Sequence, residues 1–387
     1  MSVHGPREIF RTGPNAEERI GVYIHIPFCV RKCAYCDFYS LPSDDVPKRF
    51  VDALIREIGM AAERFGRANV STIYLGGGTP SLLKPEDLDA IIRAVRGGFD
   101  VDGDCELTLE ANPGTIDADK LTAYSRAGVN RLSIGAQASQ DRLLALLGRI
   151  HRWDDVTRAA QDARLAGIDN LSVDLIYAIP TQTPNDWRGS LNGIVDLDAR
   201  HVSCYELTLE PGTVMYNIYK SIDESIALDM QCDTLRILGG AGISRYEISN
   251  YAKPGSSSRH NEGYWLRRPY LGFGPGAHSL WDAERFANPS SLDDWLGKIE
   301  SGEAAWSITE TLTRSDAAFE TMMLGLRMVK GVSLPLFHSE YGATPFSLWG
   351  GALEEMRRVG WMDWDSERIW LTPFGLDVHN AVCGMLL

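Results

Sequence analysis

Short apolar runs alternate with amphipathic stretches along most of this chain, and this alternation limits its fold more than any other feature. The stretches carry helix signals, such as Pro85 in a first turn and Gly66 after a last turn. Strands that alternate with helices pair in parallel through right-handed crossovers. Six such units predict an α/β fold, a partial (β/α)6 TIM-like barrel, with an open doubly wound sheet as the alternative. The apolar runs are GVYIHIP, STIYLGG, CELTLEA, RLSIGAQ, NLSVDLIYAIP and HVSCYELTLEP.

The alternation ends near residue 250, and the sequence beyond it predicts a second, smaller module. We expect a barrel over residues 20–252, a linker over 253–309, and a mainly helical, winged-helix-like domain over 310–387. Residues 1–19 lack the apolar stretch of a secretory signal, and we interpret them as a mobile leader.

The charge balance and the cysteine content limit the classes of function. With 38 basic and 52 acidic residues the net charge is −14, which argues against broad binding to nucleic acid, including DNA binding by the winged module. No apolar run approaches the ~20 residues of a membrane-spanning helix, although peripheral membrane contact stays open. Without a secretory signal, the seven cysteines are expected to be reduced and the chain to be cytoplasmic.

Three of the seven cysteines form a cluster directly after the first predicted strand. Cys29, Cys33 and Cys36 have the spacing Cys-x3-Cys-x2-Cys. Thiolates at this spacing can hold three corners of a [4Fe–4S] cluster and leave the fourth iron open. Zinc is the alternative, but a structural zinc ion requires four protein ligands, and here the fourth would be His25. The spacing alone leaves both metals open.

Polar residues follow or interrupt several of the predicted strands. Glu110, Gln137 and Asp174 lie at corresponding places in successive βα units, where the functional sites of such barrels are found. The glycine-rich segment GGGTPS, residues 76–81, follows the second long strand and allows a ligand to approach the backbone closely. It lacks the Gly-Lys-Ser/Thr ending of a phosphate loop. These features predict one shared cofactor site at the strand ends.

The cysteine spacing, with Tyr35 before the third cysteine, and the GGGTP segment resemble the radical S-adenosylmethionine (SAM) superfamily. The segments TLEANPGT, LGRIH, DLIYAIP and YELTLEPGT extend the resemblance to its oxygen-independent coproporphyrinogen oxidase branch. The resemblance implies that Cys29, Cys33 and Cys36 hold a [4Fe–4S] cluster whose open iron binds SAM. Ala178 and Thr181 stand where that branch commonly has glycine. The SAM contacts that it implies are Tyr23, Tyr35, Gly77, Gly78, Thr79, Glu110, Gln137, Arg149 and Asp174.

Two further features separate the members of this branch. The decarboxylating oxidase carries a fourth cysteine two residues after the third, where this chain has Phe38. The segment HNEGYW, residues 260–265, resembles the heme-binding motif of the HemW family of heme chaperones. An imidazole can ligate heme iron, and flat aromatic rings can cover a porphyrin face. The resemblance therefore implies heme binding by His260, Asn261, Tyr264 and Trp265.

The main functional hypothesis is a heme chaperone that carries a [4Fe–4S] cluster and SAM and passes heme to acceptor hemoproteins. The alternative is an enzyme, either a SAM-dependent coproporphyrinogen III oxidase or another radical SAM enzyme that acts on heme. RNA modification is a weaker third class, because the chain is acidic and lacks the cysteines for a second cluster. Cleavage of SAM would also require an electron donor as a partner.

Overall fold

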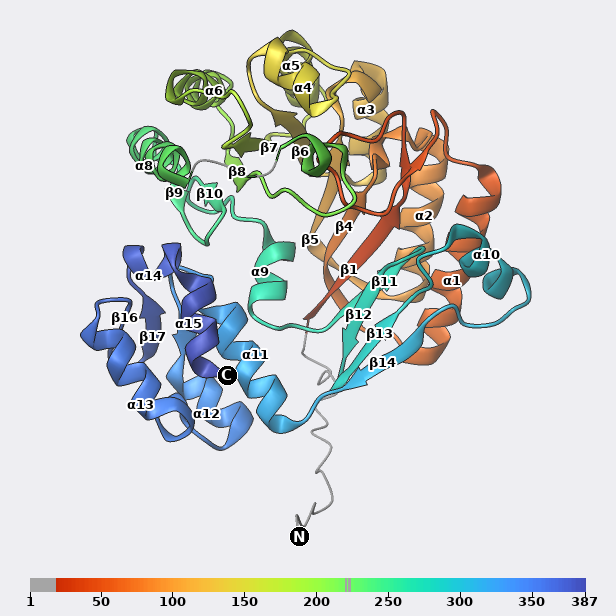
Figure 1. The fold of residues 1–387 in the computed structure, drawn as a ribbon. Helices are drawn as coiled ribbons and strands as arrows, with labels where there is room; N and C mark the ends of the chain where they lie inside the picture. The colour runs from red at the N-terminus through yellow and green to blue at the C-terminus, as the bar shows by residue number, and fades with distance from the viewer. Residues whose placement is uncertain (1–18, 220, 222–223) are drawn as a thin grey trace.

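A twelve-stranded sheet forms the centre of the molecule (Figure 1). The computed structural model describes residues 19–219, 221 and 224–387, so the predicted leader lies outside the described residues except for Arg19. Six neighbouring strands run parallel, and each of the six apolar runs forms one of them. The partial barrel is thereby confirmed. These strands are β1 (Arg19–Ile26), β4 (Asn69–Gly77), β5 (Asp100–Ala111), β6 (Arg131–Gln137), β7 (Asn170–Tyr177) and β8 (His201–Glu206).

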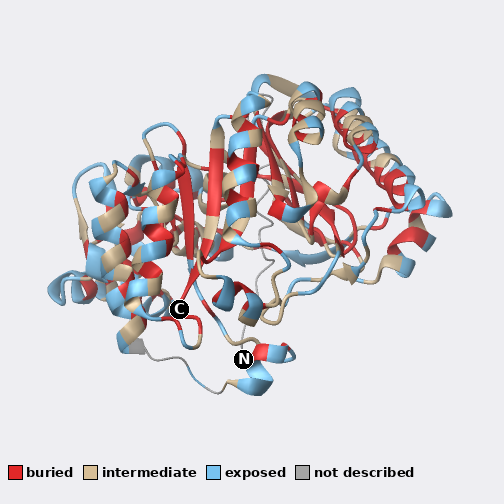
Figure 2. Ribbon diagram, turned by 90° about the horizontal axis from the view of Figure 1, so that it is seen from above, coloured by how far each residue is buried: buried red, intermediate tan, exposed pale blue. Residues whose placement is uncertain are grey.

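Helices cover the outer face of these strands, as the buried strands and the exposed outer helix faces in Figure 2 show. The residues that predicted the starts and ends of helices lie at those positions in the structure. Gly66 follows α1, and Pro85 is the first residue of α2 with Glu86 and Asp87 in the same turn. The covering helices are α1 (Lys48–Phe65), α2 (Pro85–Gly98), α3 (Ala118–Ala127), α4 (Asp141–Leu147), α5 (Trp153–Leu165), α6 (Pro184–Asp196) and α8 (Glu224–Gly240).

The segment that the sequence assigned to a linker is folded onto the barrel. Strand β11 pairs in parallel with β1, and three antiparallel strands extend the sheet beyond it. These strands are too short to show a pattern of their own, and tertiary contacts hold them. The buried carboxylate of Glu57 on α1, for example, accepts hydrogen bonds from Gly274 N (2.8 Å) and Asn288 Nδ2 (2.6 Å). The elements are α9 (Arg259–Trp265), β11 (Tyr270–Phe273), β12 (His278–Trp281), β13 (Glu284–Ala287), α10 (Leu292–Glu300) and β14 (Ser307–Thr311).

Helix α9 lies at the open side of the barrel. At one edge, β8 pairs with β10 (Asn250–Ala252), which pairs with β9 (Ser244–Arg245). At the other edge, β11 lies beside β1. The chain passes from β10 to β11 through α9, which contacts both β1 and β4 (Figure 1). The helix therefore partly closes the gap that six strands leave in a barrel.

The C-terminal module is mainly helical and contains a small three-stranded antiparallel sheet, as expected for a winged-helix-like domain. Buried ion pairs join it to the barrel side, including Arg267 Nε with Glu320 Oε2 at 3.0 Å. No helix of the described residues is long and apolar enough to cross a membrane. The elements of the C-terminal module are α11 (Arg314–Gly325), β15 (Val332–Ser333), α12 (Leu334–Tyr341), α13 (Pro345–Arg358), β16 (Met362–Trp364), β17 (Arg368–Leu371), α14 (Pro373–Asp377) and α15 (His379–Leu386).

Candidate functional site

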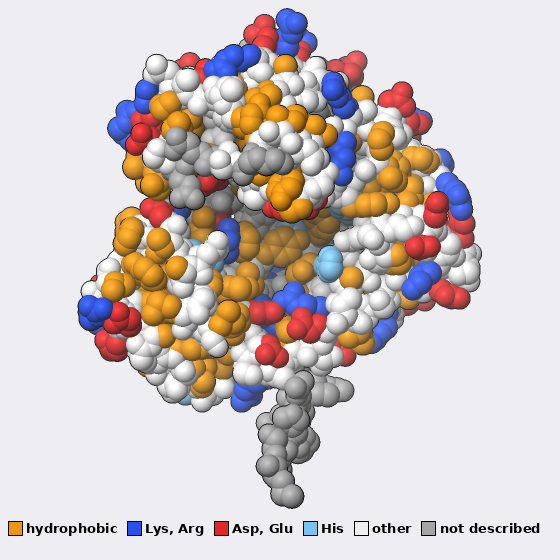
Figure 3. Space-filling model, viewed as in Figure 1, with side chains coloured by type: hydrophobic (Ala, Val, Ile, Leu, Met, Phe, Trp, Pro, Cys, Tyr) orange, Lys and Arg blue, Asp and Glu red, His pale blue; other side chains and the backbone are white. Residues whose placement is uncertain are grey.

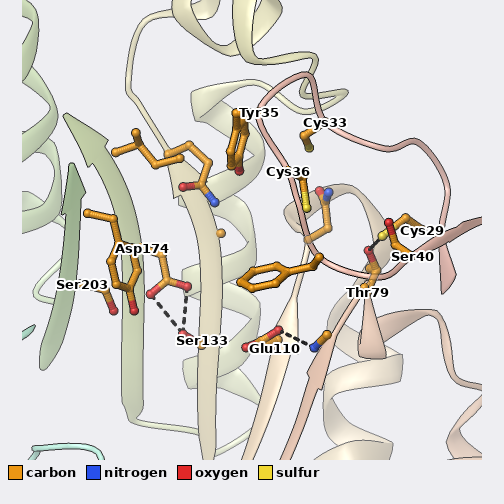
Figure 4. A pocket seen from close by; sticks show the side chains of 18 of the residues that line it. Cys29, Cys33, Tyr35, Cys36, Ser40, Thr79, Glu110, Ser133, Asp174 and Ser203 are labelled. Atoms are coloured by element: carbon orange, nitrogen blue, oxygen red, sulfur yellow. Dashed lines mark hydrogen bonds between the residues drawn. The ribbon is translucent and has the colours of Figure 1, made fainter. Parts of the chain in front are cut away.

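A cavity of about 650 Å³ opens at the carboxyl ends of the parallel strands and extends into the barrel. Figure 3 shows the molecule hollowed between the barrel and the C-terminal domain, with hydrophobic side chains gathered along the hollow. The cavity is lined by all three clustered cysteines and by eight of the nine predicted SAM contacts, many of them labelled in Figure 4. These eight residues are Tyr35, Gly77, Gly78, Thr79, Glu110, Gln137, Arg149 and Asp174.

The cysteine loop is held over the cavity by short contacts with its neighbours. Ala34 N donates to Leu147 O (2.9 Å) on α4, and Ala34 O accepts from Met215 N (2.9 Å) on α7 (Val214–Ile218). The thiols have polar partners of their own. Cys29 Sγ accepts from Thr79 Oγ1 at 3.5 Å (Figure 4), and Cys33 Sγ accepts from Arg149 Nη1 at 3.5 Å. These contacts fix the position of the loop relative to the barrel.

The three thiols suit a polynuclear cluster better than a single metal ion. Burial raises the pKa of both the Cys29 and the Cys36 thiols, so each gains from a metal that stabilises its thiolate. In the part of the chain that the structure describes, no three ligand side chains lie close enough to hold one ion. A cubane spreads its thiolate ligands over three iron atoms. The donor set therefore fits a [4Fe–4S] cluster with one open corner.

The zinc alternative depends on His25, whose ring nitrogens are both engaged. The Tyr23 hydroxyl donates to Nδ1 (2.9 Å), and Nε2 donates to Tyr39 O (3.2 Å). Tyr23 itself is the one predicted SAM contact that does not line the cavity. Its ring stacks on Tyr74 at 6.2 Å. Tyr23 thus lies behind the cavity wall, where it orients His25.

The glycine-rich segment approaches the end of β1 too closely for any side chain. A Cβ on Gly78 would lie 2.7 Å from Phe28 O, and a Cβ on Gly77 would lie 2.4 Å from His25 Cε1. Gly77 also has a φ of +109°, which disfavours other residues. The backbone of this segment consequently forms part of the cavity wall.

Two half-buried carboxylates face the cavity from neighbouring parts of the barrel. Glu110 accepts hydrogen bonds from the Tyr74 hydroxyl (2.7 Å) and Gly77 N (3.2 Å). Asp174 accepts from Ser133 Oγ at 3.1 Å (Figure 4). Burial raises the pKa of Asp174 and raises that of Glu110 to about 7. Both groups can therefore gain strongly from a cationic or hydroxyl-bearing ligand.

Arg149 connects the cysteine loop to the barrel strands. Its Nη2 donates to Gly135 O (2.6 Å), and its Nη1 donates to Cys33 Sγ. Gln137, at the end of β6, has a φ of +67°, a conformation that is uncommon for a non-glycine residue. Ala178 and Thr181 also have positive φ, at +58° and +69°. The backbone thus keeps a left-handed conformation at the positions where the resembling branch commonly has glycine.

Helix α9 carries the predicted heme motif, and of its four residues only Asn261 lines the cavity. His260 is buried, and its ring bonds through Nδ1 to Thr72 Oγ1 (2.8 Å) and through Nε2 to the Tyr264 hydroxyl (2.9 Å). Trp265 lies on the other side of the helix, under the guanidinium of Arg327 at 4.3 Å. Iron ligation by His260 would require one of its two hydrogen bonds to break.

Several cavity residues were missed by the sequence analysis. They alternate along β6, β7 and β8 with residues that pack outward, because successive side chains of a strand point to opposite faces. The motif LS in RLSIGAQ and in NLSVDLI carried this signal, since the serine of each lies on the inward face. The missed residues are Arg131, Ser133, Ser172, His201, Ser203 and Tyr205.

Comparison with known proteins agrees with this geometry. The family model described as the radical SAM superfamily matches residues 23–192, and the one described as the HemN C-terminal domain matches residues 312–378. The fold and the site are those of a radical SAM protein of the HemN-like branch, and membership of that superfamily implies a [4Fe–4S] cluster and SAM.

The chain is 35% identical to the heme chaperone HemW of Bacillus subtilis, over 94% of its own length and 98% of that protein. It is 40% identical to the heme chaperone HemW of Escherichia coli, over 67% of this chain and 69% of that protein. The chain therefore belongs to the family of the heme chaperone HemW.

A solved structure extends the comparison to the whole fold. Coproporphyrinogen III oxidase (HemN) from Escherichia coli matches with a TM-score of 0.84, over 96% of this chain and 91% of that chain. The two sequences are only 22% identical, so this likeness establishes the fold and leaves the reaction open.

Proposed function

We propose that this protein is a heme chaperone, which binds heme and passes it to acceptor hemoproteins while it carries a [4Fe–4S] cluster and SAM. The observation that carries the proposal is that α9, with the His-Asn-x-x-Tyr-Trp motif, borders the same cavity as the three cysteines. The full-length similarity to HemW proteins supports it. Phe38, at the cavity where the oxidase has a further cysteine, also favours a chaperone over the oxidase.

Each group of residues has a distinct part in this proposal. Cys29, Cys33 and Cys36 hold the cluster, and Arg149 lies beside Cys33, where it suits the carboxylate of SAM. Glu110 and Asp174 suit the ammonium and ribose hydroxyl groups of SAM. When bound, the cluster and SAM supply one-electron chemistry, and the chain positions and shields them. His260, Asn261, Tyr264 and Trp265 serve heme.

The titration of Glu110 gives a first test of this assignment. The Glu110 carboxyl group has a pKa of about 7 and is therefore mostly protonated below neutral pH when no ligand is bound. An ammonium partner favours the ionised carboxylate. We therefore expect the affinity for SAM to be full above about pH 7 and to fall by about tenfold per pH unit below it. Equilibrium dialysis with SAM across this range measures the slope. A Glu110→Gln variant with the same slope as the wild type would exclude Glu110 as its source.

Heme titration tests the motif on α9. We expect His260→Ala to weaken heme binding by roughly tenfold or more, because an axial imidazole ligand is lost. His379→Ala is the matched control, since His379 is also buried but bonds to Met323 O (2.9 Å) in the C-terminal domain. The control should keep the wild-type affinity for heme. Unaltered binding by His260→Ala would remove His260 as a principal determinant.

The oxidase alternative is separated by an activity assay on the same preparation. Reconstituted protein is incubated anaerobically with coproporphyrinogen III and SAM, and protoporphyrinogen is measured. A pure chaperone produces none, whereas turnover would establish the enzyme.

The proposal also includes a cytoplasmic location, which the seven free cysteines support. The proposal names the partners only by class, as an acceptor hemoprotein and, if SAM is cleaved, an electron donor.

A further inference from the structure

The deep part of the cavity contains a buried cation with no hydrogen-bond or ion-pair partner among the described residues. Arg131, the first residue of β6, is only 2% exposed and lines the cavity. Within the described ranges, no hydrogen bond or ion pair reaches its guanidinium, and its Nε is completely buried without an acceptor. Burying a charge without a partner is strongly unfavourable, because the charge loses its hydration. Such a side chain is therefore expected to have a ligand.

The neighbouring polar groups of the barrel interior are already engaged with one another. His201 bonds to Ser172 Oγ (2.8 Å) through Nδ1 and to the Tyr246 hydroxyl (2.9 Å) through Nε2. Asp174 accepts from Ser133 Oγ, and Glu110 accepts from the Tyr74 hydroxyl. Each group therefore has its own partner, and none of these contacts reaches Arg131.

The electrostatics of this region suit an anion. Burial and the charge of Arg131 lower the pKa of His201 and lower that of His260 to about 3, so both rings stay neutral. Burial raises the pKa of Asp174 and of Glu110, although the charge of Arg131 lowers both, and neither carboxylate forms a hydrogen bond or ion pair with Arg131 among the described contacts. An external carboxylate would complete the site, because a guanidinium binds it through two parallel hydrogen bonds.

We propose that Arg131 binds a carboxylate of the cargo, a propionate group of heme, in the interior of the barrel. This inference rests on the proposed function and adds the group that the chain recognises. The cavity is large enough for part of a drug-sized ligand, and among the exposed residues that line it are two aromatic rings, Phe38 and Tyr205, which are 70% and 42% exposed. These rings suit the macrocycle, and Arg131 suits the propionate that enters beneath it.

The carboxylate of SAM is assigned to a different arginine. Arg149 bonds to Gly135 O, which lies four residues after Arg131 along β6. At a rise of about 3.3 Å per residue, the backbone of Arg131 lies roughly 13 Å along the strand from the carbonyl that holds Arg149. Arg149 also bonds to Cys33 Sγ in the cysteine loop, so the SAM carboxylate is assigned to Arg149 and the cargo carboxylate to Arg131.

The test compares two ligands on two proteins. Heme and its dimethyl ester, which lacks free carboxylates, are each titrated into wild-type protein and an Arg131→Gln variant that carry the reconstituted cluster. We expect the variant to bind heme at least about tenfold more weakly, and wild-type protein to bind the ester with the same loss. The variant should bind the two ligands equally. Arg131→Lys should lose less, because it keeps the charge but not the planar fork.

Each of the other possible outcomes overturns either the role of Arg131 or the proposed function. Equal heme affinity in the variant and the wild type, or equal affinity of wild-type protein for heme and its ester, would overturn the role of Arg131. A tenfold loss of SAM affinity in the variant, with heme binding intact, would assign Arg131 to SAM and would also overturn its role in heme binding. Wild-type protein that binds no heme at all would overturn the proposed function and this inference with it. The ester titration uses wild-type protein, so it decides the question even if the variant fails to fold.

Discussion

Cys33→Ala is expected to reduce the iron content after anaerobic reconstitution to less than about a tenth of the wild-type value. The three cysteines are the thiols that line the cavity, and a cluster held by two thiolates has two open corners. Cys33 also accepts a hydrogen bond from Arg149, so its loss leaves a buried guanidinium without that partner. Iron analysis and the visible absorption of the cluster measure the outcome.

Cys232→Ala provides the matched control for this variant. Cys232 is free and exposed on α8, outside the cavity lining. The control should therefore hold as much iron as the wild type. A Cys33→Ala protein that also keeps the full iron content and absorption would exclude Cys33 as a cluster ligand.

Gly77→Ala is expected to lower the affinity for SAM by at least about tenfold and to destabilise the protein by about 2 to 5 kcal/mol. The added Cβ would lie 2.4 Å from His25 Cε1, and the residue would keep a φ of +109°. The ring of His25 cannot move away cheaply, because Tyr23 and Tyr39 hold both of its nitrogens. The strand end would shift instead, together with the Gly77 N–H that Glu110 accepts.

Gly97→Ala separates this local effect from a general intolerance of alanine. Gly97 lies on the exposed side of α2, and an added Cβ there meets nothing within 4 Å. Alanine in a helix interior is more favourable than glycine by roughly 0.5–1 kcal/mol, so this control should be slightly more stable than the wild type. Urea unfolding and SAM dialysis on both variants make the comparison. Wild-type SAM affinity in Gly77→Ala would show that the close approach of the backbone is not needed.

The barrel could be predicted well from the sequence, because its determinants are local. Each of the six parallel strands contains one short apolar or alternating run, and helices follow with the expected start and stop residues. The segment 253–309 could not be predicted in the same way. Its strands have four or five residues each, and they join the sheet through contacts such as that of Glu57 with Gly274 N. Such contacts join residues that are distant in the chain and leave no local pattern.

The residues of the candidate site also fall into two groups, those that a local motif marks and those that only the tertiary structure brings together. Residues with a distinctive motif, such as the clustered cysteines and the GGGTP segment, could be named in advance, and they meet at one cavity. Arg131 and Ser203 lie in ordinary strands and had no motif to mark them. Tyr23 was expected at the SAM site, and the structure shows that it bonds to His25 and does not line the cavity, so its SAM contact stays a prediction. The roles of all these residues stay predictions until the variants are measured.

The sequence by itself determined the parallel barrel, the helical second module, the family and the position of the cysteine loop, because the period of a strand and the spacing of cysteines are properties of neighbouring residues. Only the tertiary structure decided which side chains share the cavity. His260 meets Thr72 across 188 positions of sequence, and this contact turns its ring away from the cavity that Asn261 lines. Among the described residues, the tertiary structure also places no hydrogen-bond or ion-pair partner beside the Arg131 guanidinium. Whether a buried charge is paired depends on every strand of the barrel at once, and this could not be read from any one of them.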